Sequence, residues 1–231
     1  VEETALGTTI TFGLHSPDGD QGYPGNADIT VSYTLTPDNC LKLDYHMVSD
    51  ADTIANFTNH VYFNLGGYKS GSALDQKVWI DADYFTATDA NSIPTGELVA
   101  VKGTPMDFTE MKPIGRDIQE DYQALKYGNG YDHNWALNHP AGELSLSAKA
   151  EDEKTGRTME VYTDLPGVQF YTANSLKTEH GKNHAVYTPR CGYCFETQYF
   201  PDAINQPEFA SPVIKAGEEY KTTTIYKFGV K

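Results

Sequence analysis

The chain has 231 residues and a formal net charge of -15, from 32 acidic against 17 basic side chains. This length suits one domain with a substantial core, and a hydrophobic content of 39% is typical of a globular protein rather than a disordered or membrane-embedded one. The negative charge disfavours nucleic acid and anionic membranes as partners, and no run approaches the roughly 18 apolar residues that span a bilayer.

Alternation of apolar and polar residues is the first structural signal along the chain. It runs through 29–48 on both sides of Pro37-Asp38-Asn39, a turn signal, so this segment predicts a β-hairpin. Residues 78–85 predict a further strand, and the turn-rich stretch 86–110 is expected to run over the surface. Residues 113–125 predict a short helix that starts after Pro113.

The second half of the chain is also rich in predicted strands. Residues 144–151 and 159–163 alternate around a turn at 154–156. Further runs of Tyr, Phe, Thr and Val predict strands at 168–174, 193–200 and 222–229. With 20 glycines and 12 prolines between these segments, the chain predicts an all-β fold, a large two-sheet antiparallel β-sandwich with few short helices.

The chain has three cysteines, Cys40, Cys191 and Cys194. An odd number without framework spacing favours a reducing compartment, and with no signal peptide visible we expect the cytoplasm. Cys191 and Cys194 have the C-x-x-C form of a redox or metal pair. Zinc would need two further ligands of suitable spacing, none of which is obvious, and a strand rather than a redox helix follows, so we expect a structural pair.

Residues 58–67 (TNHVYFNLGG) form the first candidate site. If this segment were a strand, His60, Tyr62 and Asn64 would share one polar and aromatic face, which suits a sugar better than a core. The alternative is that His60 is a hydrogen-bonded structural histidine.

Residues 130–135 (GYDHNW) form the second candidate site. Asp132 offers a carboxylate for hydroxyl groups, and Trp135 offers a ring on which the apolar face of a sugar can stack. The alternative is an Asx turn capped by Asp132.

Glu196 and Gln169 complete the set of candidates. Glu196 stands between Phe195 and Thr197 in a predicted strand, where burial would raise its pKa and suit it to general acid or base catalysis. Gln169 could bind hydroxyl groups. A solvent-facing Glu196 and a structural Gln169 are the alternatives. No G-x-S-x-G or H-E-x-x-H motif and no phosphate-binding loop supports other chemistry.

Five motifs together carry a resemblance to a known family: SPDGDQGYPGN (16–26), TNHVYFNLGG (58–67), GYDHNWALN (130–138), LPGVQFYTAN (165–174) and FETQYFPDAIN (195–205). In this order and spacing the chain resembles aldose 1-epimerases (galactose mutarotases). The resemblance implies one galactose mutarotase-like β-sandwich domain over 1–231, lacking the family's N-terminal third.

The resemblance also implies an activity and residue roles. The reaction would interconvert the α and β anomers of free hexoses such as galactose and glucose, with no cofactor and no metal. His60 would protonate the ring oxygen as general acid, and Glu196 would remove the C1 hydroxyl proton as general base. Asp132 and Gln169 would bind the sugar, and Val61 and Tyr62 would lie beside its ring.

One departure from the family pattern bears on partners. The L-H-G-G motif and the sugar-binding Asn-Arg pair that precede the SPDG segment in the family are absent, so a separate N-terminal fragment is an expected partner. A hexose-6-phosphate epimerase would need a basic cluster, and only Arg116, Arg157 and Arg190 are present, all outside the motifs. A non-catalytic sugar-binding module or a purely structural sandwich would also fit the absence of that segment.

Overall fold

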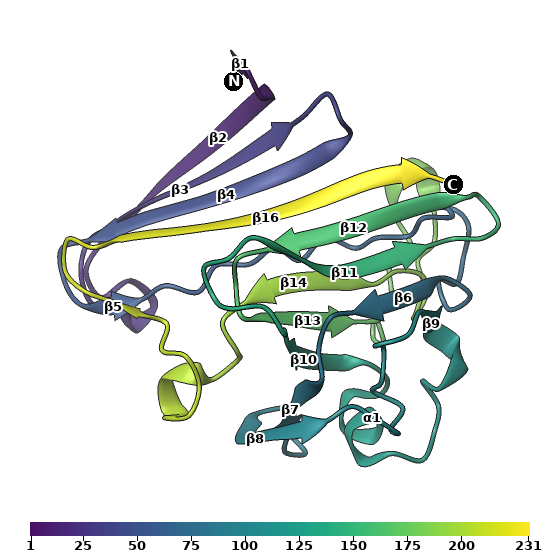
Figure 1. The fold of residues 1–231 in the computed structure, drawn as a ribbon. Coiled ribbons are helices and arrows are strands. Elements are labelled where there is room, and N and C mark those ends of the chain that lie inside the picture. The colour runs from purple at the N-terminus through teal and green to yellow at the C-terminus, as the bar shows by residue number, and fades with distance from the viewer.

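Two antiparallel sheets dominate the structure, a computed structural model that describes residues 1–231 (Figure 1). The larger sheet has, from edge to edge, β1 (Glu2–Thr4), β2 (Gly7–Ser16), β3 (Ala27–Leu35), β4 (Cys40–Ser49), β16 (Glu219–Val230), β12 (Arg157–Thr163), β11 (Ser145–Glu151), β6 (Lys77–Ile80) and β9 (Lys112–Pro113). The smaller sheet has β14 (Cys194–Gln198), β13 (Gly167–Tyr171), β10 (Asp132–Ala136), β7 (Tyr84–Thr88) and β8 (Pro94–Ala100).

The remaining elements are short. Strand β15 (Val213–Ile214) pairs with β5 (Thr53–Ile54). One α-helix is present, α1 (Gln123–Gly128), with four 3-10 turns: η1 (Asp20–Gly22), η2 (Ile114–Arg116), η3 (Lys182–His184) and η4 (Ala203–Asn205). With six residues, α1 is far too short to span a bilayer, and no other helix could do so.

The core lies between the two sheets, with β13 and β14 beneath β11, β12 and β16 in the view of Figure 1. Trp135, Phe170 and Phe195 on the smaller sheet are fully buried. Two polar contacts join the sheets: the Tyr226 hydroxyl lies 2.8 Å from the carbonyl oxygen of Phe195, and the Thr197 and Thr224 hydroxyls lie 2.5 Å apart. The position of the smaller sheet is therefore fixed by apolar packing and by specific hydrogen bonds.

The all-β antiparallel class is confirmed, and so are most of the predicted strands. The predicted hairpin 29–48 corresponds to β3 and β4, which pair in register along their whole length. Strands β11 and β12 pair around the predicted turn. Strands β1 and β2 were not predicted.

Three sequence predictions are wrong in detail. Residues 78–85 are two strands, because the chain leaves the larger sheet after Ile80 and enters the smaller one at Tyr84. Residues 86–110 are not only surface: they contain β8, and Met106 and Phe108 are buried. After Pro113 the chain forms only the 3-10 turn η2, and the α-helix begins at Gln123.

The outer part of the larger sheet exposes an apolar face. On β2, Phe12 and Leu14 are 58% and 63% exposed. Phe12 pairs with Val31 on β3, which pairs with the buried Tyr45 on β4. Since cross-strand partners share a face, the apolar stripe of the core continues outward to β2, which extends away from the smaller sheet (Figure 1).

Candidate active site

Strands β10, β13 and β14 present one polar face and one apolar face. Asn134, Gln169 and Glu196 are cross-strand partners in register. Asp132 and Cys194 both pair with Tyr171, one row further along. Because side chains alternate along a strand, these residues share the face opposite to the core-facing aromatic side chains. The sheet thus brings Asp132, Gln169 and Glu196 together, although 64 positions (196 − 132) separate the first from the last.

His60 reaches this face from an irregular segment rather than from a strand. Its Nε2 lies 3.3 Å from Glu196 Oε1, and its Nδ1 lies 3.4 Å from Cys194 Sγ. The neighbouring residues hold the segment: Asn59 Oδ1 lies 2.8 Å from the Tyr226 hydroxyl, and Phe63 forms an isolated bridge with Tyr193. The histidine side chain is 50% exposed, so it contacts both the carboxylate and solvent.

The electrostatic environment of the site is dominated by burial. The Glu196 side chain is only 12% exposed, so it does not face solvent. Burial raises the pKa of Glu196 to about 7; His60 opposes this shift, and the charge of Asp132 adds to it. Burial likewise raises the pKa of Asp132, opposed by the hydrogen bond from Gln169 and by His60. Burial, with the charges of Glu196 and Asp132, also raises the pKa of Cys194.

Gln169 links the site residues and leaves one polar atom free. Its Nε2 donates a hydrogen bond of 2.8 Å to Asp132 Oδ1, so Asp132 uses its side chain here rather than in an Asx turn. Its Oε1 is buried without a hydrogen-bond partner. A buried acceptor without a partner is costly, and a ligand that donates a hydrogen bond would satisfy it.

Aromatic rings border the site, but the ring that the sequence predicted there, Trp135, is not among them. Trp135 is fully buried in the core, where its Nε1 donates to the carbonyl oxygen of Met106, so the expectation that it stacks on a sugar is wrong. Tyr62, 44% exposed, and Tyr171 pack instead around His60, with ring centroids 5.0 and 5.8 Å from the imidazole. Val61 is exposed in the same segment.

Tyr171 and Cys194 are the site residues that the sequence reasoning missed. Each lies two positions from a predicted residue, Tyr171 after Gln169 and Cys194 before Glu196. The period of two along a strand could therefore have found both. The three cysteines are free thiols; Cys194 is buried and Cys191 is partly exposed.

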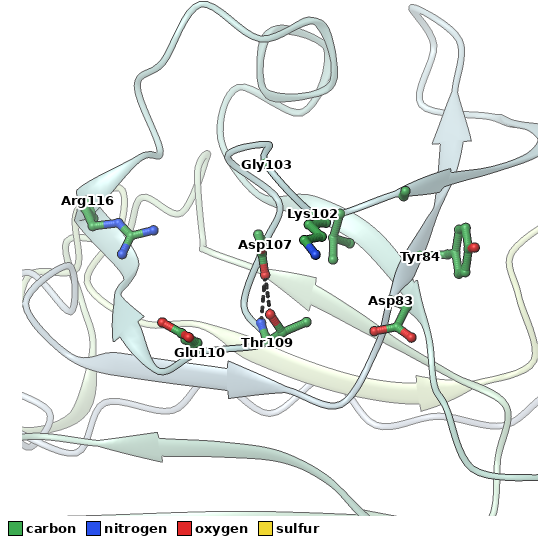
Figure 2. A pocket seen from close by; sticks show the side chains of 10 residues that line it. Asp83, Tyr84, Lys102, Gly103, Asp107, Thr109, Glu110 and Arg116 are labelled. Carbon is green, nitrogen blue, oxygen red and sulfur yellow. Dashed lines mark hydrogen bonds between the residues drawn. The ribbon is translucent and has the colours of Figure 1, made fainter.

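A cavity of about 890 Å³ lies elsewhere, beside β7 and β8. Figure 2 shows its charged lining, in which Asp107 accepts hydrogen bonds from the backbone and hydroxyl of Thr109. Arg116 in the same lining is paired with Asp117. None of the predicted site residues lines this cavity, so the acid and base groups stand apart from it.

Comparisons with known proteins identify the family of the chain. Residues 1–227 match the sequence model of a family described as aldose 1-epimerase. Human galactose mutarotase is 42% identical over 97% of this chain and 64% of its own length. The aldose 1-epimerase of Haemophilus influenzae is 38% identical over 95% of this chain and 64% of its own length. The chain therefore spans less than two thirds of these curated relatives.

Solved structures with the same fold include two from distant organisms. A galactose 1-epimerase from Lactobacillus acidophilus superposes with a TM-score of 0.84 at 29% identity, covering 98% of this chain and 64% of that chain. A GalM/aldose epimerase homologue from C. elegans superposes with a TM-score of 0.86 at 24% identity, covering 100% of this chain and 67% of that chain. At 24% identity, the C. elegans structure shows a shared fold only.

Proposed function

This chain belongs to the aldose 1-epimerase family, and we propose that it interconverts the α and β anomers of free aldohexoses such as galactose and glucose. One observation carries the proposal: His60 Nε2 lies 3.3 Å from Glu196 Oε1, next to the hydrogen-bonded pair of Asp132 and Gln169. An acid, a base and groups that bind hydroxyls are thus held on one face of a rigid sheet.

The chemistry needs only proton transfers. Glu196 removes the proton from the C1 hydroxyl while His60 protonates the ring oxygen, so the C1–O5 bond breaks and the open-chain aldehyde forms. Rotation about C1–C2 presents the other face of the carbonyl group. The ring oxygen then attacks that face as His60 takes back its proton and Glu196 returns one to the new C1 hydroxyl. Each well-placed acid or base contributes roughly 10²–10⁴-fold to such a rate.

The raised pKa of Glu196 supports its role as base. A base is most effective when its pKa lies near the working pH, because it is then both ionised in a useful fraction and basic enough to accept the proton. Burial and Asp132 bring the pKa of Glu196 to about 7, with His60 opposing the shift.

The sugar hydroxyls are assigned to Asp132 and Gln169. The unpartnered Oε1 of Gln169 supports this assignment, because a hydroxyl donor would satisfy it. Tyr62 and Val61, both exposed beside His60, are assigned to the flank of the ring, where an aromatic face favours contact with the apolar C–H surface of a sugar.

A phosphorylated hexose is a poorer fit. The three arginines are engaged elsewhere: Arg116 with Asp117, Arg157 with the carbonyl oxygen of Leu65, and Arg190 with that of Asn129. No arginine is therefore held ready for a phosphate beside Glu196.

The second candidate function is a sugar-binding domain that becomes active only with a further segment. The exposed apolar face of β2 favours it, since a polypeptide that packed there would bury Phe12 and Leu14. We propose that residues 1–231 form one domain and that the family's N-terminal segment packs on this face of β2. The free thiols support a reducing compartment, and we propose the cytoplasm.

Polarimetry with freshly dissolved α-glucose tests these proposals. We expect slow mutarotation by the 231 residues alone, and a large increase when the family's N-terminal segment is co-expressed. In the complemented protein, Glu196→Gln should abolish turnover while Glu97→Gln, at an exposed position, should not. Full activity of Glu196→Gln would remove it as the base, and no activity with the segment present would refute the epimerase function.

A further inference from the structure

Cys194 places a thiol inside the acid–base site, where the proposed reaction has no use for it. Its Sγ lies 3.4 Å from His60 Nδ1, and Glu196 Oε1 lies 3.3 Å from Nε2 of the same ring. One ligand atom from each of His60, Cys194 and Glu196 lies within 4.8 Å of the other two. Imidazole nitrogen, thiol sulfur and carboxylate oxygen are the three ligand types that zinc takes in proteins.

The spacing of these atoms fits a small tetrahedral cation. With Zn–N near ~2.0 Å and Zn–S near ~2.3 Å, tetrahedral geometry puts neighbouring ligand atoms about 3.3–3.5 Å apart. The contacts of His60, 3.3 Å from Nε2 to Glu196 and 3.4 Å from Nδ1 to Cys194, have this length but start from different ring nitrogens, and one ligand atom from each residue lies within 4.8 Å of the other two. Only one ring nitrogen of His60 can bind the metal. The His60 and Glu196 side chains must therefore rotate to bring all three ligand atoms to bonding distance from one ion.

Charge and access also favour a cation. Burial raises the pKa of the Cys194 thiol, and the carboxylates of Glu196 and Asp132 add to this shift. The site thus contains two carboxyl groups and a thiol but only one imidazole, a composition that favours binding of a cation. The His60 side chain is half exposed, which gives an ion a route from solvent.

We propose that His60, Cys194 and Glu196 form a reversible binding site for a thiophilic divalent cation of the zinc type, with three protein ligands and one position left for water. Binding releases the thiol proton and forms the metal–thiolate bond, so no oxidant or reductant takes part. The thiolate favours Zn²⁺, Co²⁺ and Cd²⁺ over Mg²⁺ and Ca²⁺. Since the metal occupies both the acid and the base, it inhibits the proposed epimerase; that consequence alone depends on the proposed function.

Titration of the reduced 231-residue protein with Co²⁺ tests the site without any activity. We expect one equivalent of Co²⁺ to produce a sulfur-to-metal charge-transfer absorption, which Zn²⁺ then displaces. Cys194→Ser should remove this absorption. Cys191→Ser is the matched control, three residues away and outside the cluster, and should retain it. No absorption in the folded wild-type protein, or an absorption that survives in Cys194→Ser, overturns the proposal.

A second variant covers the case in which Cys194→Ser fails to fold, since that position is buried. Glu196→Gln should weaken Co²⁺ binding by at least about tenfold, because even loss of an outer-shell partner typically costs ten- to a hundredfold. Unchanged affinity in Glu196→Gln overturns the three-ligand set.

Polarimetry then separates this inference from the proposed function. Inhibition by Zn²⁺ that a chelator reverses supports both. Co²⁺ binding together with no mutarotation, even with the N-terminal segment present, retains the metal site and refutes the epimerase. Full mutarotation with the site saturated by Zn²⁺ overturns the inhibitory role.

Discussion

Removing Lys112 and removing Asp117 from their buried ion pair should lower the stability of the fold by different amounts. The Lys112 side chain is 1% exposed, and its Nζ donates to Asp117 Oδ2 at 2.7 Å and to the carbonyl oxygen of Pro105 at 2.6 Å. The same ammonium lies 4.2 Å from the ring centroid of Phe108. Phe108 in turn packs on Phe170, directly behind the strand that carries Gln169, so the pair supports the base of the candidate site.

The two partners differ in what remains to bind each of them when the other is removed. In Lys112→Met, Asp117 keeps Arg116, whose Nη2 lies 2.9 Å from it, and the Pro105 carbonyl keeps the Tyr131 hydroxyl at 3.0 Å. The loss is then about 0.5–1.5 kcal/mol, that of one net hydrogen bond. In Asp117→Ala, the Lys112 ammonium stays buried without a counter-charge, which costs about 3–5 kcal/mol.

Thermal unfolding followed by circular dichroism measures this difference. For a chain of this size, each kcal/mol shifts Tm by about 2–4 °C, so Asp117→Ala should lower Tm by about 6–20 °C and Lys112→Met by about 1–6 °C. The double variant should be more stable than Asp117→Ala, because the unpaired charge is gone. Equal losses in the two single variants, or a double variant less stable than both, would refute the reasoning.

The same pair should also shape stability in acid. Burial alone would raise the pKa of Asp117, but hydrogen bonds from Arg116 and Lys112 outweigh it and hold the pKa below its ordinary value. The folded pKa is therefore lower than the unfolded value of about 3.9. Its contribution to stability is complete above that pH and is lost as the pH falls through the folded pKa. Asp117→Ala should lack this part of the acid dependence of Tm.

Three further outcomes are expected from single substitutions. Tyr226→Phe removes a buried hydroxyl that lies 2.8 Å from both Asn59 Oδ1 and the carbonyl oxygen of Phe195, and should cost about 1–3 kcal/mol in thermal unfolding, because one of these two oxygens loses its donor. Gln169→Leu should weaken galactose binding in isothermal titration by at least about tenfold, since it leaves the Asp132 carboxylate without its 2.8 Å donor. Phe12→Thr, at a 58% exposed position, should change the stability of the chain by less than about 0.5 kcal/mol while weakening binding of the N-terminal segment.

Each of these outcomes has a result that contradicts it. A Tyr226→Phe protein as stable as wild type would mean that the hydroxyl makes no net contribution. Galactose affinity unchanged in Gln169→Leu would remove this residue from the sugar site. Large destabilisation by Phe12→Thr in the isolated chain would mean that the outer face of β2 is already packed.

The sequence predicted the strands better than the connections between them. Period two is a local signal, and it located β3, β4, β11 and β12 because each buries one face. Strand β2 was not predicted although it carries the same signal, since Ile10, Phe12 and Leu14 alternate with Thr9, Thr11 and Gly13. Strand β1 has only three residues, too few to show a period. The burial of Met106 and Phe108 inside a turn-rich stretch depends on distant strands that close over them, which no local pattern reports.

The candidate site shows the same division between local and tertiary information. Alternation along β10, β13 and β14 fixes which side chains share a face, so Asp132, Gln169 and Glu196 could be grouped once their strands were adjacent. The adjacency itself is tertiary. Trp135 was predicted to stack on a sugar because Asp132, three residues before it, is polar. The strand period of two places positions 132 and 135 on opposite faces, so Trp135 enters the core instead.

Strands β10, β13 and β14 carry the site residues on one face and core residues on the other, so the site stays intact only while the core is intact. A slip of one residue in any of these pairings would turn Phe170 or Phe195 toward solvent and bury Gln169 or Glu196. No register therefore exists in which the core is intact and the polar row is displaced by one position. The site should accordingly be lost all at once, as a cooperative event of unfolding, and substitutions on the polar side can change its chemistry while the apolar side continues to hold its geometry.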